Sequence, residues 1–430
     1  MSDLTFAIED WVAHGEGAHE DVATRGFLRV DVGAACLTRN DSSWSQSTSD
    51  RVLVSMYPAA LWLAANWWRL CWEPRRGEFQ QVYEWNASHE LAAAGHGYLW
   101  PNLRFVADGE SVSVIASPTD PASNQPVRYL ADVDVDVPRP LFERASSDFI
   151  EKVIARLNDL RLAQTELEKL WADVCAERAS PDDARARRLE ALLGCDPDEG
   201  DANAIGALLS LQSEAGTSAT DELATVLSGA DVVSVLQRLK DASRNGIANI
   251  AQLDEAFERE LAACRAGGQS SSVPWERGMA AARVLRSSRG VGPDALTDVD
   301  LLGLLGLDQR VLQSDPQLDW LPLGLAVRDQ TQLRVLLRSR NKRSRRFDLA
   351  RLVGDLALAP QADRWHPVTG LKTSRQKAQR AFAAELLCPV DGLSRYLGGD
   401  RSEDALDAAA EHFDVSTRIV QHQVENHLDW

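Results

Sequence analysis

The sequence lacks the features that would take the chain into or across a membrane. Residues 59–72 form its most apolar stretch, but Asn66 and Arg69 interrupt it, and a spanning helix needs roughly 20 apolar residues. Residues 1–4 carry no basic segment followed by an apolar core, so we expect no secretion signal. The six cysteines form no CxxC pair and are typical of reduced thiols. We therefore expect a cytoplasmic protein with no membrane association.

The sequence also has too little positive charge for its whole surface to bind nucleic acid. It carries 46 Lys and Arg against 64 Asp and Glu, a formal net charge of −18, whereas phosphate attraction needs a basic surface. It contains no P-loop, no Rossmann glycine pattern and no nucleophile elbow. At 430 residues, 44% hydrophobic and 26% charged, the chain is typical of a globular protein of two or three domains.

Residues 1–140 have the pattern of a β-rich domain with one inserted helix. Apolar and polar residues alternate in residues 26–39, which predicts a half-buried strand. Asp108 and Gly109 lie between two alternating segments and predict a hairpin turn. Asp132, Asp134 and Asp136 fall on one face of a further strand. We interpret them as a solvated face rather than a metal site, because no other ligand type clusters beside them.

Tryptophan is concentrated at the beginning of the chain. Eight of the thirteen tryptophans lie in the first 100 residues, and several fall in residues 57–72, where Pro58 suits the first turn of a helix. Such a density could form a stacking platform for bases or a peptide groove. We favour a core in which this helix packs on the sheet, because tryptophan is commonly buried.

From residue 141 the hydrophobic period changes to that of helices. Residues 141–265 carry successive amphipathic segments, the first with Ser146 or Ser147 as the expected N-cap and the last over residues 247–264. Residues 266–274 are rich in Gly and Ser, end in Pro and predict a linker. We place a domain boundary there, so the last domain covers residues 275–430.

Three phrases in this last domain follow one another in a specific order. Residues 346–355 read RFDLARLVGD, residues 382–389 read FAAELLCP and residues 409–416 read AAEHFDVS. In this order they resemble the ImmA/IrrE family of bacterial zinc metallopeptidases, over about residues 275–428. The resemblance implies a zincin-like fold, and a setting in phage defence, mobile elements or stress responses.

The positions that would carry the zinc chemistry of that family are changed. A zincin helix needs two His at i and i+4 with a Glu between them as general base. By the resemblance these positions are Arg351, Leu352 and Asp355, and the third ligand falls on Ala378. Leu cannot accept a proton, and an Arg repels Zn²⁺. We interpret the domain as a pseudopeptidase with no cofactor; an enzyme with rewired ligands is the alternative.

Rewired ligands would have to come from the remaining histidines and acids. His89, Glu90 and His96 resemble a zinc motif, but the two histidines are seven residues apart and a Gly-His-Gly turn is expected at the second. His366, which Pro367 places in a loop, and Glu385 lie within the family match. The tail histidines are expected on exposed helix faces.

A basic run before the degenerate helix keeps nucleic-acid binding open. No acid interrupts it, and the last two helices, with Ser416 as expected N-cap of the second, loosely resemble a helix-turn-helix. The alternative is a solvated loop that pairs with acids elsewhere. The run comprises Arg334, Arg338, Arg340, Lys342, Arg343, Arg345 and Arg346, of which the last five are the candidate contacts.

Taken together, the sequence predicts an α+β protein with a β-rich N-terminal domain, a helical middle region and a zincin-like C-terminal domain. We expect a non-catalytic regulatory or scaffolding component that binds a protein partner, since a peptidase groove can hold a peptide without cleaving it. A divergent metallopeptidase that cleaves a regulatory protein and a nucleic-acid-binding regulator remain the alternatives. The partner, the pathway and the oligomeric state are not determined by the sequence.

Overall fold

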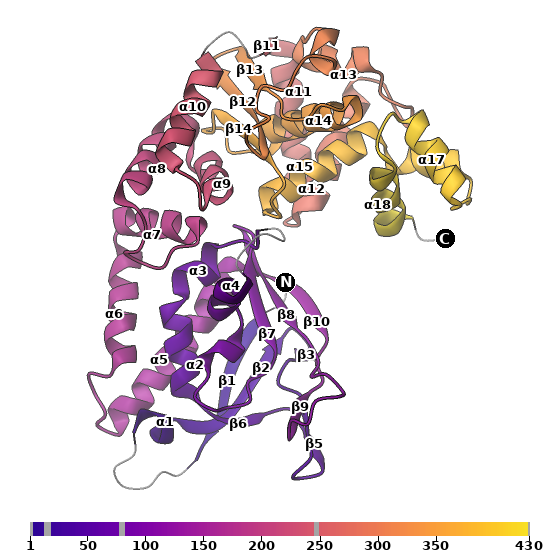
Figure 1. The fold of residues 1–430 in the computed structure, drawn as a ribbon. Helices are drawn as coiled ribbons and strands as arrows, with labels where there is room; N and C mark the ends of the chain where they lie inside the picture. The colour runs from indigo at the N-terminus through magenta and orange to yellow at the C-terminus, as the bar shows by residue number, and fades with distance from the viewer. Residues whose placement is uncertain (1–2, 13–18, 77–81, 245–248, 429–430) are drawn as a thin grey trace. The chain divides into compact units, whose positions relative to one another are not determined.

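The computed structural model describes residues 3–12, 19–76, 82–244 and 249–428 and is mixed α+β (Figure 1). The chain falls into two compact units, residues 1–205 and residues 206–430, each with its own sheets and helices. None of the described helices combines the length and the apolar character that crossing a bilayer requires.

The N-terminal unit is rich in antiparallel sheet. In one sheet β2 pairs with β1, β3 and β6; the other two have the orders β10-β8-β7 and β5-β4-β9. Its strands are β1 (Leu4–Trp11), β2 (Arg25–Val32), β3 (Ala35–Cys36), β4 (Asn40–Ser42), β5 (Ser47–Ser49), β6 (Val52–Ser55), β7 (Leu103–Ala107), β8 (Ser111–Ala116), β9 (Val127–Tyr129) and β10 (Val133–Pro138).

The strand predicted over residues 26–39 is confirmed only as far as residue 32, because a turn at Gly33 separates β2 from the short β3. Alternate residues of β2 are buried, as the period-2 pattern requires. The hairpin turn joins β7 to β8, and the carboxylate of Asp108 accepts hydrogen bonds from the backbone N–H groups of Glu110 and Ser111, at 3.1 and 2.8 Å. The three aspartates at residues 132, 134 and 136 are exposed, as a solvated strand face requires.

The prediction of one inserted helix in this unit is wrong, because the segment forms several short helices. The tryptophans of this segment nevertheless build a core: Trp62, Trp67, Trp68 and Trp72 are all buried. Trp67 also packs edge-on against Trp171, at 5.0 Å between ring centroids. The helices are α1 (Glu20–Ala23), α2 (Met56–Ala65), α3 (Trp67–Trp72), α4 (Val82–His89) and the 3₁₀ helix η1 (Leu91–Ala94).

The first long helix starts earlier than the sequence predicts. Ser146 and Ser147 were the expected N-caps, but α5 (Arg139–Asp159) already includes them. Pro140 lies in its first turn, where the fixed φ of proline favours helix initiation and its missing N–H costs nothing. Three further helices follow: α6 (Glu166–Ala179), α7 (Pro181–Leu193) and α8 (Ala202–Ala215), the last spanning the division between the units.

The C-terminal unit contains an antiparallel sheet of order β11-β13-β12-β14 among helices. Its strands are β11 (Asn249–Gln252), β12 (Leu323–Asp329), β13 (Gln332–Leu336) and β14 (Trp365–Thr369). Its helices are α9 (Thr217–Leu227), α10 (Val232–Arg244), α11 (Glu255–Gly268), α12 (Pro274–Ser288), α13 (Asp298–Leu305), η2 (Gln309–Leu312), α14 (Lys342–Leu358), α15 (Ser374–Leu387), α16 (Val390–Leu397), α17 (Glu403–His412) and α18 (Thr417–His427).

Two elements of this sheet correct the sequence predictions. The expected helix over residues 247–264 begins only at Glu255, because residues 249–252 pair with β13 as strand β11; residues 247–248 lie outside the described residues. His366 does not lie in a loop but in β14. Pro367 is compatible with that strand because β14 is an edge strand, where a missing N–H disrupts no second ladder.

The predicted linker at residues 266–274 is also not a domain boundary. Gly267 and Gly268 lie in the last turn of α11, and a Cβ at either position would come within 2.7 Å of the side chain of Val284 or Leu358. These glycines therefore allow α11 to approach its neighbours closely. The Gly-rich composition reflects helix packing, and the division of the chain lies near residue 205 instead.

The tightest helix contact of this unit is between α12 and α15. A Cβ at Gly278 of α12 would lie 2.2 Å from the carbonyl oxygen of Ala378 and 2.8 Å from the backbone nitrogen of Phe382. We expect Gly278→Ala to lower the free energy of unfolding by about 1–3 kcal/mol, because backbone atoms cannot move aside. Urea denaturation of both proteins measures the difference.

Gly303 of α13 provides the matched control, because a Cβ there meets no atom within 4 Å. Gly303→Ala should raise the free energy of unfolding by about 0.5–1 kcal/mol through helix propensity alone. Equal effects of the two substitutions would contradict the close packing of α12 on α15.

Candidate functional site

A buried network of polar side chains connects α14, β14 and α15 in the C-terminal unit. Asp355 is at its centre, on the helix that the sequence analysis identified as a degenerate zinc helix. His366 reaches it from β14, and Arg375 and Gln379 reach it from one face of α15. Asp355 is 1% exposed, so its charge has to be satisfied within the protein.

Four hydrogen bonds satisfy the Asp355 carboxylate. Arg375 donates two of them, from Nε at 2.8 Å and from a terminal nitrogen at 2.6 Å, one to each carboxylate oxygen. His366 Nδ1 lies at 2.9 Å and Gln379 Nε2 at 2.7 Å. Burial alone would raise the pKa of the Asp355 carboxyl, but the Arg375 charge and the His366 hydrogen bond outweigh it and hold this pKa well below its usual range.

Arg375 joins this carboxylate to a second one. Its other terminal nitrogen donates to Asp363 at 2.6 Å and to the Ser218 hydroxyl at 3.0 Å. Burial raises the pKa of Asp363, and the single bond from Arg375 offsets this only in part, so Asp355 is the more firmly ionised of the two. The guanidinium thus forms a charge-assisted centre that ties α14, α15 and the loop before β14 together.

Arg351 lies one turn before Asp355 but makes different contacts. It is 4% exposed and donates to the carbonyl of Thr369 and to Oε1 of Gln376. Burial, together with the charge of Arg380, lowers the pKa of Arg351. Its cationic side chain is therefore held by neutral acceptors at the end of β14.

Helix α9 covers β14, the edge strand next to this network. All five residues of β14 are buried, and the N–H of Arg364, just before the strand, donates to the carbonyl of Ala215 at 2.8 Å. Glu222 of α9 is buried, accepts a hydrogen bond from the Thr373 hydroxyl and has a pKa raised by burial. A peptide could not add to this edge without displacing α9.

The four degenerate zinc-motif positions do not form a metal site. Leu352 is fully buried in the hydrophobic core, and Ala378 carries only a methyl group, so the neighbouring Gln379 reaches Asp355 instead. The Arg375 guanidinium contacts both oxygens of Asp355, and a second cation there would be repelled. Zinc does not fit these residues. Among the described residues, no group of three or more His, Cys, Asp and Glu could hold a metal ion.

The other candidate zinc ligands also face separate partners. His89 stacks on Trp85 and contacts its carbonyl at 2.8 Å, whereas Glu90 accepts a hydrogen bond from Arg104 Nε at 2.9 Å. His96 lies 3.0 Å from the Asp21 carboxylate. Each residue of the motif is therefore engaged in a different direction, and they do not converge.

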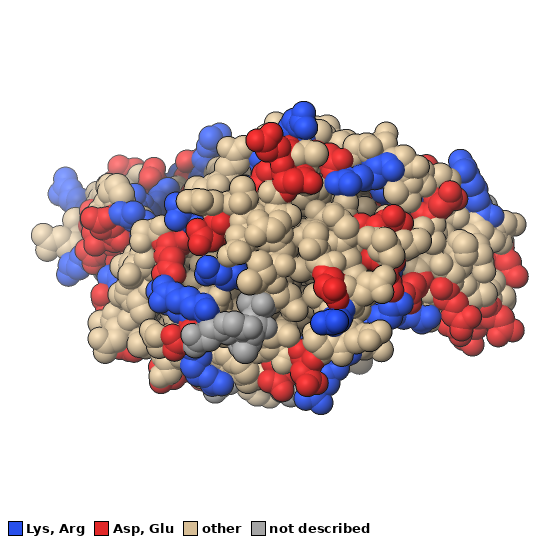
Figure 2. All heavy atoms as spheres, turned by 90° about the horizontal axis from the view of Figure 1, so that it is seen from above, with Lys and Arg blue, Asp and Glu red and all other residues tan. Residues whose placement is uncertain are grey.

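The basic run does not form a continuous exposed surface. Arg345 and Arg346 are 0% and 1% exposed and bind inside the protein: Arg345 donates to carbonyls of the preceding loops, and Arg346 pairs with Asp298. Lys342 and Arg343 both pair with Asp414, while Arg340 is exposed and lies 3.5 Å from Asp319. On the face shown in Figure 2, Lys and Arg are interspersed with Asp and Glu.

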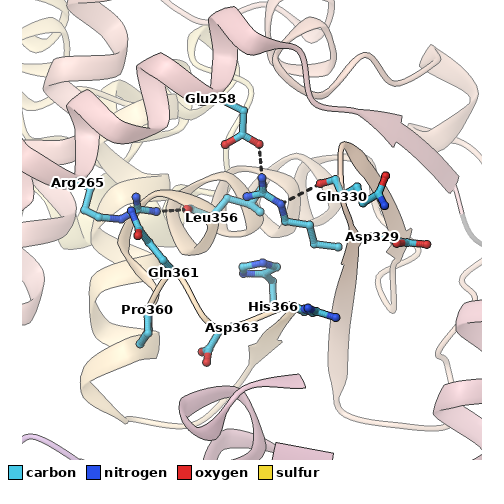
Figure 3. A pocket seen from close by; sticks show the side chains of 11 residues that line it. Glu258, Arg265, Asp329, Gln330, Leu356, Pro360, Gln361, Asp363 and His366 are labelled. Atoms are coloured by element: carbon cyan, nitrogen blue, oxygen red, sulfur yellow. Dashed lines mark hydrogen bonds and ion pairs between the residues drawn. The ribbon is translucent and has the colours of Figure 1, made fainter. Parts of the chain in front are cut away.

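A pocket opens beside the network, and His366 and Asp363 belong to both. Its volume is about 520 Å³, and α11, the β12–β13 hairpin, the end of α14 and the loop into β14 line it. Figure 3 shows the His366 ring in the middle of this pocket, below Glu258 and between Arg265 and Gln330.

Comparison with protein-family models, with curated proteins and with solved structures gave no match. The resemblance to the ImmA/IrrE family therefore stays a prediction from the three sequence phrases.

Sequence reasoning did not find the partners of Asp355. Arg375 and Gln379 are four residues apart and so share one face of a helix, which is a readable signal. Asp363, however, lies in a loop, and nothing in its neighbourhood indicates that it meets an arginine twelve positions later. The approach of α9 from a distant segment left no local signal at all.

We expect Arg375→Met to lower the free energy of unfolding by about 3–5 kcal/mol, because it leaves two buried carboxylates without their cation. Urea denaturation at neutral pH measures this effect. Arg310→Met is the control: its side chain is 95% exposed, and its removal should change the same quantity by about 0.5 kcal/mol or less. A similarly small effect of Arg375→Met would contradict the central role of this ion pair.

His89 should make the stability of the protein sensitive to acid. Burial lowers the pKa of His89 from 6.5 to about 3, so between these values the unfolded chain binds a proton that the folded chain does not. Stability should therefore fall as the pH falls, by up to about 1.4 kcal/mol per pH unit from this residue.

His89→Phe retains an aromatic ring against Trp85, which stacks on His89 at 4.1 Å between centroids, but removes the titrating group. Comparing unfolding midpoints at about pH 6.5 and pH 5 should show a weaker pH dependence in this variant. Parallel dependences in the two proteins would show that folding does not lower the pKa of His89.

Proposed function

We propose that the C-terminal unit is a non-catalytic, zincin-like domain of the ImmA/IrrE type, and that the chain acts as a regulatory or scaffolding component that binds a protein partner. By the sequence resemblance, its setting would be a bacterial phage-defence system, a mobile element or a stress response. Peptide hydrolysis is not part of this role.

The observation that carries the proposal is the bidentate contact between Arg375 and Asp355. Asp355 falls at a position where the resemblance places a zinc ligand, and the protein supplies its own cation there. Leu352 falls where a general base would act and cannot take a proton from water. Both changes preserve packing of the helix while removing its chemistry, which supports a retained fold with a binding role.

Binding of a protein partner is supported by the net charge of the chain rather than by the network, since the polar side chains around Asp355 are buried and bound to one another. The net charge of −18 favours a partner with a basic surface, because complementary charge speeds association.

No observation specifically supports either of the two alternative functions. A divergent metallopeptidase would need ligands that converge, and His89, His96, His366 and Glu385 have separate partners; Glu385 itself pairs with Arg283 at 2.8 Å. A nucleic-acid regulator would need the basic run at the surface, where Arg345 and Arg346 are not found.

The first experiment is elemental analysis of untagged protein purified without chelator, together with a proteolysis assay. We expect far less than one zinc per chain, no peptidase activity and no change in thermal unfolding on adding zinc. About one zinc per chain, lost with a peptidase activity in chelator and absent from Asp355→Asn, would overturn the pseudopeptidase proposal.

The binding role is tested separately by affinity purification at native expression level. A specific partner should co-purify with the wild-type chain in stoichiometric amount and be lost at high salt if basic charge recognises this acidic protein. Repeated recovery of the chain alone would contradict the scaffolding role without affecting the argument about zinc.

A further inference from the structure

The pocket beside His366 has carboxylates that are already neutralised. Three of its lining residues are acidic, and each contacts an arginine. The pairs are Glu258 with Arg328, Asp329 with Arg334 at 3.6 Å, and Asp363 with Arg375 at 2.6 Å. The negative charge of these groups is therefore directed at cations of the protein rather than at the pocket interior.

Two further arginines of the lining have no such partner. Within the described residues, Arg265 and Arg364 form no ion pair with any carboxylate. Arg265 donates from one terminal nitrogen to the carbonyl of Leu356 at 3.1 Å, and its Nε is buried with no hydrogen-bond partner. Arg364 is exposed at the end of the loop before β14. In a chain of net charge −18, two unpaired guanidinium groups on one pocket favour an anionic ligand.

The third group is the free nitrogen of His366. Its side chain is 4% exposed, and Nδ1 lies 2.9 Å from an Asp355 oxygen. Because Asp355 is ionised and can only accept, Nδ1 must be the donor, which leaves Nε2 as the ring nitrogen available to a ligand. Nε2 is buried without a partner, and Figure 3 shows the ring within the pocket.

A phosphomonoester has the chemistry that suits each of the three groups. It is anionic and accepts hydrogen bonds from guanidinium forks, and near neutral pH it still carries a proton for part of the time, since its second pKa is about 6. A phosphate group can therefore donate to a lone pair on Nε2 of His366 or accept from an N–H there, whereas a carboxylate can only accept.

We propose that this pocket is a binding site for the phosphate group of a small phosphomonoester. The volume of about 520 Å³ lies in the usual range for small-molecule sites and is far larger than a phosphate ion requires, so the ligand carries an organic part as well. This site is a separate proposal from the scaffolding role, because its ligand is a small molecule rather than a protein.

The test is isothermal titration of the full chain with inorganic phosphate and with adenosine monophosphate, at constant ionic strength. We expect one site per chain, with tighter binding of the nucleotide than of phosphate. Arg364→Gln and Arg265→Gln should each weaken binding about tenfold or more, the effect of losing a charged hydrogen bond. Arg310→Gln removes the same charge from an exposed site outside the pocket and should leave affinity unchanged.

A second measurement follows His366 directly. The ¹⁵N signal of its Nε2 should shift when phosphate is added to the wild-type chain, and this shift should require much more phosphate in Arg364→Gln. Because Arg364 is exposed, this variant retains the fold even if Arg265→Gln does not.

Three results would overturn the proposal. These are the absence of binding by both probes at millimolar concentration, an equal loss of affinity in Arg310→Gln, and binding of acetate at the same residues as tight as that of phosphate. Loss of phosphate binding with retained capture of a protein partner would reject this site alone, and the reverse outcome would reject only the scaffolding role.

Discussion

A buried arginine between two buried carboxylates imposes the strongest constraint on the C-terminal unit. Asp355 and Asp363 come from α14 and from the loop before β14, and they meet at Arg375 of α15. In a low-dielectric interior each charge would be costly alone, so the three segments must stay together for any of them to be buried. The register of β14 and the position of α9 also depend on this contact, because Arg375 donates a hydrogen bond to the Ser218 hydroxyl of α9.

The same contact connects the fold to the proposed functions. A guanidinium is planar and fixed in charge, so it holds Asp355 ionised but cannot activate water as a metal ion does. The network therefore holds the three segments together. It affects the pocket at His366, because the ionised Asp355 fixes which ring nitrogen donates and leaves the other ring nitrogen available to a ligand in the pocket.

Much of the local structure could be predicted from the sequence because its causes are local. Alternation identified β2, a single Asp-Gly pair identified the turn between β7 and β8, and the clustered tryptophans identified a core. The sequence predictions are wrong where residues that are distant in the chain determine the local structure. Residues 249–252 are a strand because β13 lies beside them, and His366 is in a strand because Pro367 falls on an edge. The Gly-rich segment at residues 266–274 was misread because glycine serves flexibility and close packing alike.

The sequence by itself determined the α+β class of the protein, its net negative charge and the presence of Arg351, Leu352 and Asp355 where the proposed resemblance would place zinc chemistry, because these depend only on which residues are present. Only the tertiary structure decided which side chains surround Asp355. Asp355 and Asp363 both bind Arg375, which lies 20 and 12 residues further along the chain, and α9 covers the edge strand from more than 130 residues upstream. Such pairings follow from the burial of charge in a shared core, and no periodicity in the sequence indicates them.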